Sequence, residues 1–286
     1  MNILITGCNG QLGNEMQLLE RMNPQYDYFN TDVAELDITD ADAVNRFVDE
    51  NHIDGIVNCA AYTAVDKAES NEELCTRLNA EAPAYLAAAI DKHEGWMIQI
   101  STDYVFDGTN HTPYTEDEDT CPNSVYGRTK LVGEFNVLKL CKRSMIIRTA
   151  WLYSSFGNNF VKTMLRLGKE KSELGVIFDQ IGTPTYAHDL AVAIFMAINK
   201  GIVPGIYHFT NEGVTSWYDF TKAIHRIAGI KDCQVRPLHT SEYPTPAARP
   251  HYSVLDKTKI KQTYGLDIPY WQDSLEVCIG KLLNDK

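Results

Sequence analysis

The chain has 286 residues, of which 44% are hydrophobic, and its formal net charge at neutral pH is −12. This size allows one large α/β domain or a nucleotide-binding domain with a smaller appendage. The acidic balance argues against a surface that binds nucleic acid or membranes. The longest uninterrupted apolar run, residues 191–198, is too short to span a bilayer.

Seven cysteines are scattered along the chain without a Cys-x-x-Cys pair. This pattern indicates neither a zinc site nor a disulfide framework, and the odd number fits a reducing compartment. Because a strand is expected directly after Met1, we expect no signal peptide and a cytoplasmic location.

The first residues predict a buried strand that leads into a nucleotide-binding loop. Residues 3–5 form a short apolar run, and glycines then recur as Gly-x-x-Gly-x-x-Gly at Gly7, Gly10 and Gly13 before an amphipathic helix. The first glycine would permit a tight turn, the second a close approach to a pyrophosphate, and the third close packing of helix on sheet. The helix N-terminus would offer free N–H groups to that pyrophosphate.

A second strand is expected over residues 26–30, just before Asp32. A carboxylate in this place can accept hydrogen bonds from the adenosine ribose, although a turn or capping role fits its position equally well. Asp37 and Ile38 would then lie over the adenine. No arginine adjoins Asp32 to hold a 2′-phosphate, so we expect NADH to serve at least as well as NADPH.

Strand and helix patterns alternate through the rest of the first half. We expect further strands at 54–61, 95–101 and 144–148, and helices at 41–51 and 71–92. This order predicts an α/β fold with a doubly wound parallel (Rossmann) sheet, in which ligands gather beyond the carboxyl ends of the strands.

From about residue 152 the pattern loosens. Helices are expected at 159–169, 187–199, 217–227 and 271–283, and strands at 175–178 and 205–210. We therefore expect residues 1–151 to form an NAD(P)-binding domain with the catalytic residues. Residues 152–286 would form mainly a smaller α/β substrate-binding region, which can return strands or helices to the first domain.

Three side chains suggest carbonyl reduction. Thr102 follows the fourth expected strand, and Tyr126 and Lys130 stand at i and i+4 of one helical face. A threonine hydroxyl can polarise a carbonyl, a tyrosine can supply the proton, and a nearby ammonium favours the phenolate and can bind ribose hydroxyls. Alone, such a Tyr-x-x-x-Lys pair is usually a solvated helix face, and a Ser-Thr after a strand is usually a turn.

In this order, the glycine loop, Thr102 and the Tyr126–Lys130 pair resemble the extended short-chain dehydrogenase/reductase superfamily. Within it, the chain resembles the family of bacterial dTDP-4-dehydrorhamnose reductases. The segments that carry this resemblance are 58–69, 101–106, 125–130, 148–153, 157–164 and 243–250. It implies reduction of the C4 keto group of dTDP-4-dehydro-L-rhamnose to dTDP-L-rhamnose with NADPH or NADH.

The resemblance also implies which residues touch each ligand. The cofactor phosphates would contact Gly10, Gln11 and Leu12, and its ribose and nicotinamide would contact Ala61, Tyr62 and Thr63. Thr102 and Asp103 would touch the sugar, Trp151 would pack against it, and Arg249 would face the nucleotide diphosphate. A core position for Trp151 and a surface position for Arg249 are the structural alternatives.

Some relatives form dimers around Mg²⁺ held by carboxylates. Glu15 on the first helix could serve in this way, but residues 282–286 do not clearly supply a second glutamate. We therefore expect a monomer or homodimer that acts on a dTDP-sugar, without an assigned metal ligand and without a nucleic-acid or membrane partner.

Three related functions are alternatives to simple reduction. A 4,6-dehydratase would place a second acid after Asp103, where this chain has Tyr104. A 4-epimerase would retain its NAD through catalysis. A non-catalytic relative, such as the regulatory subunit of methionine adenosyltransferase, need not keep Thr102, Tyr126 and Lys130.

Overall fold

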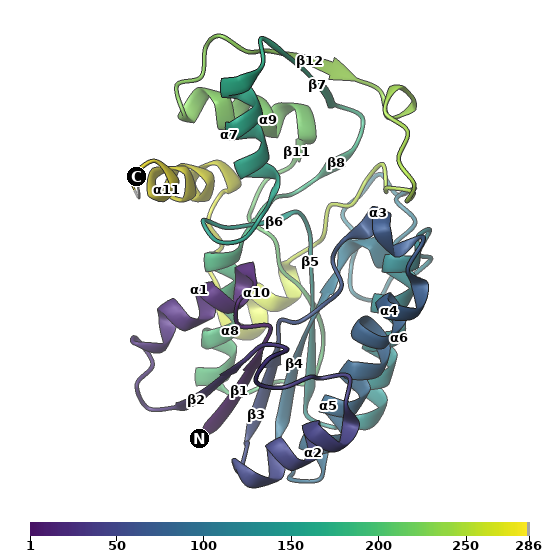
Figure 1. Ribbon diagram of the computed structural model, residues 1–286, viewed down its shortest axis with the longest axis vertical. Helices are drawn as coiled ribbons and strands as arrows, with labels where there is room; N and C mark the ends of the chain where they lie inside the picture. The colour runs from purple at the N-terminus through teal and green to yellow at the C-terminus, as the bar shows by residue number, and fades with distance from the viewer. Residues whose placement is uncertain (285–286) are drawn as a thin grey trace.

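The computed structural model describes residues 1–284 and contains a six-stranded, all-parallel sheet (Figure 1). The strand order is β10 (Gly205–His208), β5 (Ser144–Thr149), β4 (Trp96–Thr102), β3 (Gly55–Asn58), β1 (Asn2–Thr6) and β2 (Asp27–Thr31). The chain passes from β1 to β2 on one side and returns to β3 on the other. This reversal opens a crevice beyond the carboxyl ends of β1 and β3.

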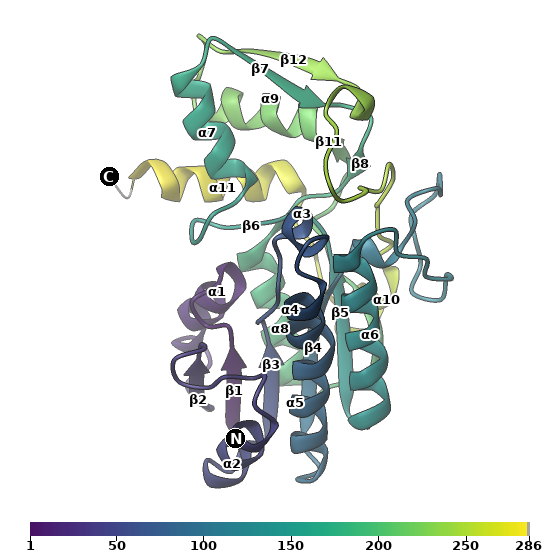
Figure 2. The ribbon, with the colours of Figure 1, turned by 45° about the vertical axis from the view of Figure 1, so that its right-hand side comes forward.

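Helices cover both faces of the sheet (Figures 1 and 2). One face carries α1 (Gln11–Glu20), α8 (Ala187–Lys200) and α10 (Thr258–Tyr264), and the other carries α2 (Ala41–Glu50), α5 (Ala82–Asp91) and α6 (Val125–Leu140). The central strands are buried on both sides because each face has its own apolar cluster. The predicted fold class is confirmed.

A smaller unit sits beyond the carboxyl edge of the sheet (Figure 2). It contains α7 (Phe160–Glu170), α9 (Trp217–Ile227), α11 (Trp271–Asn284) and the parallel pair β7 (Glu173–Ile177) and β12 (Gln234–Leu238) around a third apolar cluster. Short strands β6 (Leu152–Tyr153), β8 (Ile181–Gly182), β9 (Thr185–Tyr186) and β11 (Thr215–Ser216) connect it to the sheet unit. Residues after 152 thus supply α8, β10 and α10 to the sheet unit.

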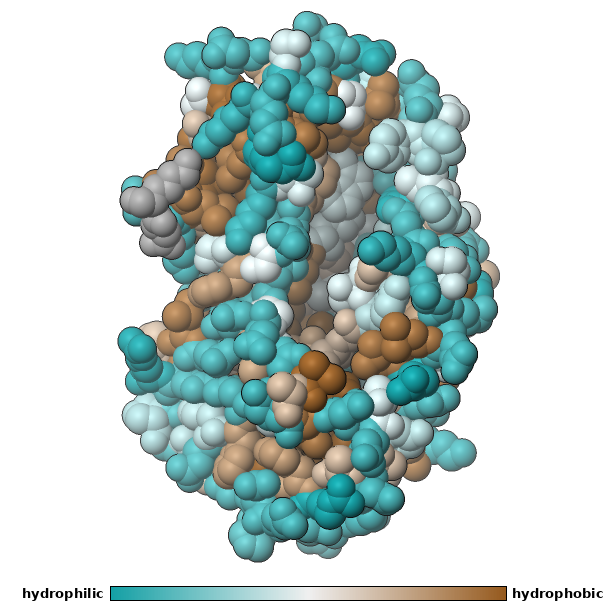
Figure 3. All heavy atoms as spheres, viewed as in Figure 1, coloured by the Kyte–Doolittle hydropathy of each residue, from teal (hydrophilic) through white to brown (hydrophobic). Residues whose placement is uncertain are grey.

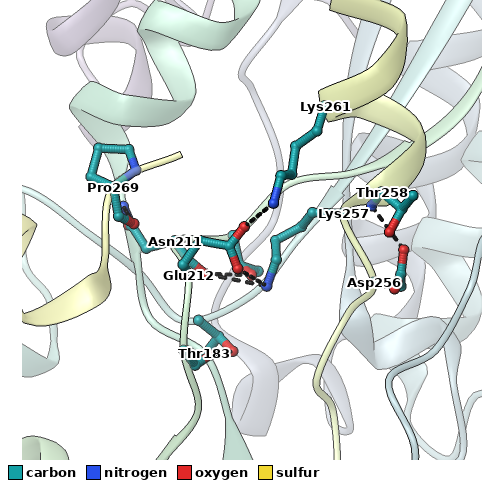
Figure 4. A network of polar contacts seen from close by, with 10 residues as sticks. Thr183, Asn211, Glu212, Asp256, Lys257, Thr258, Lys261 and Pro269 are labelled. Atoms are coloured by element: carbon teal, nitrogen blue, oxygen red, sulfur yellow. Dashed lines mark hydrogen bonds and ion pairs between the residues drawn. The ribbon is translucent and has the colours of Figure 1, made fainter. Parts of the chain in front are cut away.

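After residue 152 the chain passes more than once between the smaller unit and the sheet unit. A polar cluster stabilises these passages (Figure 4). Glu212 accepts from Lys261 at 2.7 Å and pairs with Lys257 at 3.5 Å. The neighbouring Asn211 donates to the carbonyl of Pro269 at 3.2 Å. The segment after β10, the start of α10 and the approach to α11 are therefore fixed against one another.

One expected helix is interrupted. Residues 71–92 form α4 (Glu72–Thr76), a π-helical turn (Arg77–Glu81) and α5 instead of one regular helix. The π turn directs the Asn79 side chain to both the N–H and the C=O of Tyr62. At Gly133, α6 lies so close to the Asn79 carbonyl that no Cβ would fit. Such a deviation depends on tertiary packing, which helix propensity does not contain.

Helix caps follow the expected chemistry. Asp40 accepts from the first turn of α2, and Ser216 caps α9. Ser124 caps α6 in the same way, which fixes where the helix that carries Tyr126 begins. None of the helices in residues 1–284 has the length and apolar character that a membrane span requires.

Candidate active site

Two adjoining cavities lie between the sheet unit and the smaller unit, where Figure 3 shows the surface hollowed. The inner cavity, about 630 Å³, lies against the glycine loop, and the outer cavity, about 950 Å³, lies against α7, β7 and the segment 243–249. They share the lining residues Thr63, Val65, Tyr104 and Trp217.

The inner cavity brings together most of the predicted site residues. These are Gly7, Gly10, Gln11, Leu12, Asp32, Ala61, Thr63, Thr102, Asp103, Tyr126, Lys130 and Trp151. Gly13, Asp37, Ile38 and Tyr62 do not line it, and Arg249 lines the outer cavity instead.

The glycine loop has the geometry that a dinucleotide requires. Gly7 has φ of 65°, and a Cβ there would lie 2.7 Å from the Ala60 nitrogen, so only glycine fits. Gly10 precedes α1 without any side-chain cap, which leaves the helix N-terminus open to a ligand. Gly13 lies against the Gly7 carbonyl and lets α1 pack onto the loop.

Asp32 directly follows β2 at the edge of the inner cavity. Its carboxylate accepts the N–H of Asn9 at 3.2 Å and that of Val33 at 2.8 Å. Lys130 is the one described lining residue of this cavity with a cationic side chain. The immediate surroundings of Asp32 within the cavity therefore hold no charge to balance a 2′-phosphate.

Asp37 and Ile38 follow β2 but are not among the lining residues of the inner cavity. Asp37 is exposed and accepts from both the N–H and the hydroxyl of Thr39. Ile38 is buried in the apolar cluster below α2 and α5. Burial of the Ile38 side chain stabilises the fold because it removes apolar surface from water.

Thr102, Tyr126 and Lys130 meet at the inner cavity because β4 ends beside the first turns of α6. Lys130 is 3% exposed and donates from Nζ to the carbonyl of Ile100 at 2.6 Å. Burial lowers the pKa of Lys130 to about 8, while the charge of Glu134 opposes this shift.

Burial and a hydroxyl are the main influences on the pKa of the Tyr126 phenol in this structure. Burial raises the pKa of Tyr126 well above its usual value, and the Thr102 hydroxyl is the group that lowers it. Lys130 is not one of these main influences. Sequence spacing showed that the two residues share a helical face, but desolvation of the phenol outweighs the nearby charge.

Glu134 is a buried positioning residue that the sequence did not reveal. It accepts from Arg148 at 2.7 Å (Nη2) and 3.0 Å (Nε), and also from the Ser101 hydroxyl. Ser101 precedes Thr102 on β4, whereas Arg148 precedes Thr149 on β5. This network joins α6 to the ends of both strands and so fixes the distance between Thr102 and the α6 side chains.

Trp151 spans the junction between the two units. Its indole stacks on that of Trp217 from α9, with ring centroids 3.6 Å apart and planes 12° apart. Its backbone has φ of 50°, which is rare for a residue with a side chain. Both indoles line the inner cavity. Trp217 was missed because its partnership with Trp151 spans more than sixty residues of sequence.

Arg249 forms an ion pair with Asp66. Its guanidinium binds both oxygens of Asp66, at 2.8 and 3.0 Å. Arg249 and Lys67 are the cationic side chains among the described residues that line the outer cavity. Asp66 lies on the short helix α3 (Val65–Ala68), so this ion pair connects the segment 243–250 to the sheet unit.

Asn159 is a further lining residue that the sequence reading did not single out. Its side chain caps α7 by accepting from Lys162 and donates to the Gln11 side chain at 2.9 Å. It therefore connects the glycine loop to the first helix of the smaller unit. A capping asparagine before a helix was the available signal.

Glu15, which could serve a metal by resemblance to some relatives, lies inside the protomer. Its carboxylate is fully buried, accepts from the Ser154 hydroxyl at 2.6 Å, and lies 3.1 Å from Nδ1 of His188. Its partners within the protomer are thus a hydroxyl and an imidazole. No cluster of three His, Cys, Asp or Glu suited to a metal occurs in residues 1–284, and Asp285 and Lys286 lie outside the described residues.

The chain is similar to known proteins over almost its whole length. The family described as "RmlD substrate binding domain" matches residues 1–284. A dTDP-4-dehydrorhamnose reductase from Aggregatibacter actinomycetemcomitans is 43% identical, covering 96% of this chain and 97% of that protein. The chain belongs to the dTDP-4-dehydrorhamnose reductase family.

Solved structures of this family have the same fold. A dTDP-4-dehydrorhamnose reductase from Clostridium acetobutylicum has a TM-score of 0.95 and 46% identity, covering 99% of this chain and 100% of that chain. The enzyme of this family from Bacillus anthracis, described in complex with NADP, has a TM-score of 0.93 and 41% identity, covering 98% and 99%. Both cover the sheet unit and the smaller unit together.

Proposed function

We propose that the protein catalyses the NAD(P)H-dependent reduction of the C4 keto group of dTDP-4-dehydro-L-rhamnose to give dTDP-L-rhamnose, with Tyr126 as proton donor. The observation that carries this proposal is the meeting of Thr102, Tyr126 and Lys130 with the glycine loop in one cavity. Family membership supplies the substrate class.

The residues present fit a nicotinamide dinucleotide. The open N-terminus of α1 and the side-chain-free Gly7 and Gly10 suit a pyrophosphate, and Asp32 suits a ribose. Lys130 lies where it can bind the second ribose. When bound, the cofactor supplies the hydride. The residues around it would hold it in place.

Thr102 at the end of β4 and Tyr126 at the start of α6 supply the groups for proton donation. The carbonyl oxygen would lie between the hydroxyls of Thr102 and Tyr126, so that a proton can pass from Tyr126 as negative charge develops on that oxygen. The stacked indoles of Trp151 and Trp217 offer an apolar surface to the deoxysugar. Arg249 and Lys67 would bind the diphosphate in the outer cavity.

In this proposal the two parts of the chain divide the work. Residues 1–151 bind the cofactor and supply the catalytic side chains. Residues 152–286 supply mainly the substrate-binding surfaces, and they complete the first domain with α8, β10 and α10.

The cofactor preference of this chain is a separate proposal. A relative binds NADP, whereas Asp32 here accepts hydrogen bonds and has no arginine beside it. We propose that NADH is used at least comparably to NADPH.

The test is an assay of NADH and NADPH oxidation with dTDP-4-dehydro-L-rhamnose, followed by identification of the product. Stoichiometric conversion to dTDP-L-rhamnose supports the proposal. Turnover without net oxidation and with retained NAD would indicate an epimerase, elimination of water would indicate a dehydratase, and no turnover would indicate a regulatory relative.

A further inference from the structure

Asp103 has a buried carboxyl group, and contact with the substrate alone does not explain its burial and its hydrogen bond to Thr102. It is 2% exposed, lines the inner cavity and directly follows Thr102. Its Oδ1 accepts the Thr102 hydroxyl at 3.0 Å. Its Oδ2 is buried without a hydrogen bond of good geometry, although the Ser253 hydroxyl lies close enough to affect the carboxyl.

The Thr102 hydroxyl has one proton, which it can donate either to the Asp103 carboxylate or to the Tyr126 phenolate. Its oxygen already accepts the N–H of Tyr104 at 3.2 Å, and its proton points to Asp103. The same hydroxyl is the side-chain partner that lowers the pKa of Tyr126. Thr102 therefore stands between the Tyr126 phenol and the Asp103 carboxyl.

An ionised Asp103 would accept the hydrogen bond from Thr102, so the Thr102 proton would not be available to Tyr126. A protonated Asp103 can donate to the Thr102 oxygen instead, which frees the Thr102 proton. Burial raises the pKa of Asp103 to about 6, against the opposing hydrogen bonds of Ser253 and Thr102. A substrate that fills the cavity removes more water and raises this pKa further.

The other groups around Asp103 do not reverse this effect. The titratable neighbours are Tyr104 on the same segment and Tyr126 on α6, and both phenols have a pKa raised by burial. The charged pair Asp66 and Arg249 acts on Tyr104, whereas burial and hydrogen bonds are the main influences on the pKa of Asp103.

We propose that Asp103 is the proton reservoir behind Tyr126, in a relay that runs from the Asp103 carboxyl through the Thr102 hydroxyl to the Tyr126 phenolate. This rests on the proposed reduction. As Tyr126 gives its proton to the carbonyl oxygen, the Thr102 O–H bond breaks and the Tyr126 O–H bond re-forms in the same step, while the Thr102 oxygen takes the proton of the Asp103 carboxyl. Asp103 regains a proton from water after the product leaves.

The test uses two variants that preserve shape. Asp103→Asn keeps an oxygen that accepts from Thr102 but holds no transferable proton, and Thr102→Val removes the hydroxyl at the same volume. For wild type, both variants and the double variant, kcat is measured from pH 5 to 9, and in mixtures of H₂O and D₂O. Binding of the nicotinamide cofactor and Tm serve as controls for folding.

The acid form of Asp103 is the active one, so wild-type kcat should fall as pH rises through the pKa of Asp103 in the complex. A separate decline above about pH 8, from Lys130, should remain in every variant. Asp103→Asn should lose the first decline and reduce kcat at low pH by at least about tenfold. The isotope dependence should be curved in wild type and linear in Asp103→Asn, because fewer protons then move together.

The double variant separates a relay from two independent contacts. Members of one relay are non-additive, so Thr102→Val/Asp103→Asn should be scarcely slower than Thr102→Val alone. A linear isotope dependence in wild type would overturn the relay even if the variants failed to fold. An Asp103→Asn enzyme with raised KM and an unchanged pH profile would also overturn it. A wild-type protein without turnover would instead refute the proposed function.

Discussion

The ion pair between Asp66 and Arg249 leads to an unusual prediction, namely that removing a carboxylate tightens substrate binding. Arg249 can bind a diphosphate fully only if it leaves Asp66, which it contacts at 2.8 and 3.0 Å. The Asp66 side chain is 40% exposed and the Arg249 side chain is 24% exposed. Asp66 therefore competes with the substrate for the same guanidinium.

The size of the effect follows from this exposure. A solvent-screened ion pair contributes up to about 1 kcal/mol, which corresponds to a factor of about five in affinity. Asp66→Asn should therefore lower the Kd for dTDP by about two- to fivefold. The asparagine oxygen can still accept the N–H of Ala247, as Asp66 does at 3.3 Å, so the segment 243–250 stays in place.

Arg249→Ala should act in the opposite direction. Loss of charge-assisted hydrogen bonds costs about 1.5–3 kcal/mol, so the Kd for dTDP should rise by roughly ten- to a hundredfold. Calorimetric titration with dTDP measures both variants. Glu170→Gln is the matched control, because it removes the carboxylate partner of Arg166 on α7 outside both cavities.

Affinity for the nicotinamide cofactor should be unchanged in all three variants, because Asp66 and Arg249 line the outer cavity only. If Asp66→Asn weakens dTDP binding as Arg249→Ala does, the pair orients the binding segment and the competition argument is refuted.

Four further outcomes follow from the inner cavity. Tyr126→Phe should keep the fold and cofactor affinity but lose about 10²–10⁴-fold in kcat, and near-normal turnover would remove Tyr126 as the proton donor. Asp32→Ala should shift the ratio of kcat/KM values toward NADPH, and a wild-type enzyme strongly selective for NADPH would show that Asp32 serves elsewhere. Cofactor affinity should weaken as pH rises through about 8, where buried Lys130 loses its charge; Lys130→Met should bind weakly at all pH values, and a wild-type pH dependence that survives in it would contradict the assignment. Trp151→Ala should raise KM for the nucleotide sugar without changing cofactor Kd, whereas equal weakening of both ligands together with a lower Tm would indicate a structural role.

The sequence by itself determined the strands of the parallel sheet, most of the long helices and the residues that lie close to one another along the chain. Alternating apolar strands and helices predicted the parallel sheet, because backbone periodicity and burial on both faces leave a local pattern. The glycine spacing predicted the turn at Gly7, and the i, i+4 spacing placed Tyr126 and Lys130 on one face of α6. Similarity over almost the whole chain then gave the family.

Only the tertiary structure decided how distant side chains combine. Asp66 and Arg249 are paired across more than 180 residues. Trp217 on α9 stacks on Trp151, which follows β5. Glu15 on α1 is enclosed by His188 of α8 and by Ser154. These contacts depend on the packing of whole elements, which no local pattern encodes.

Charge states were likewise beyond the sequence. Spacing predicted that Lys130 would ease proton loss from Tyr126, but the pKa of each group is set mainly by the loss of water around it. That loss depends on atoms contributed by β4, α6 and the segments across the cavity. The sequence therefore supplied the chemical groups of the site, and the folded chain determined which of them hold a proton.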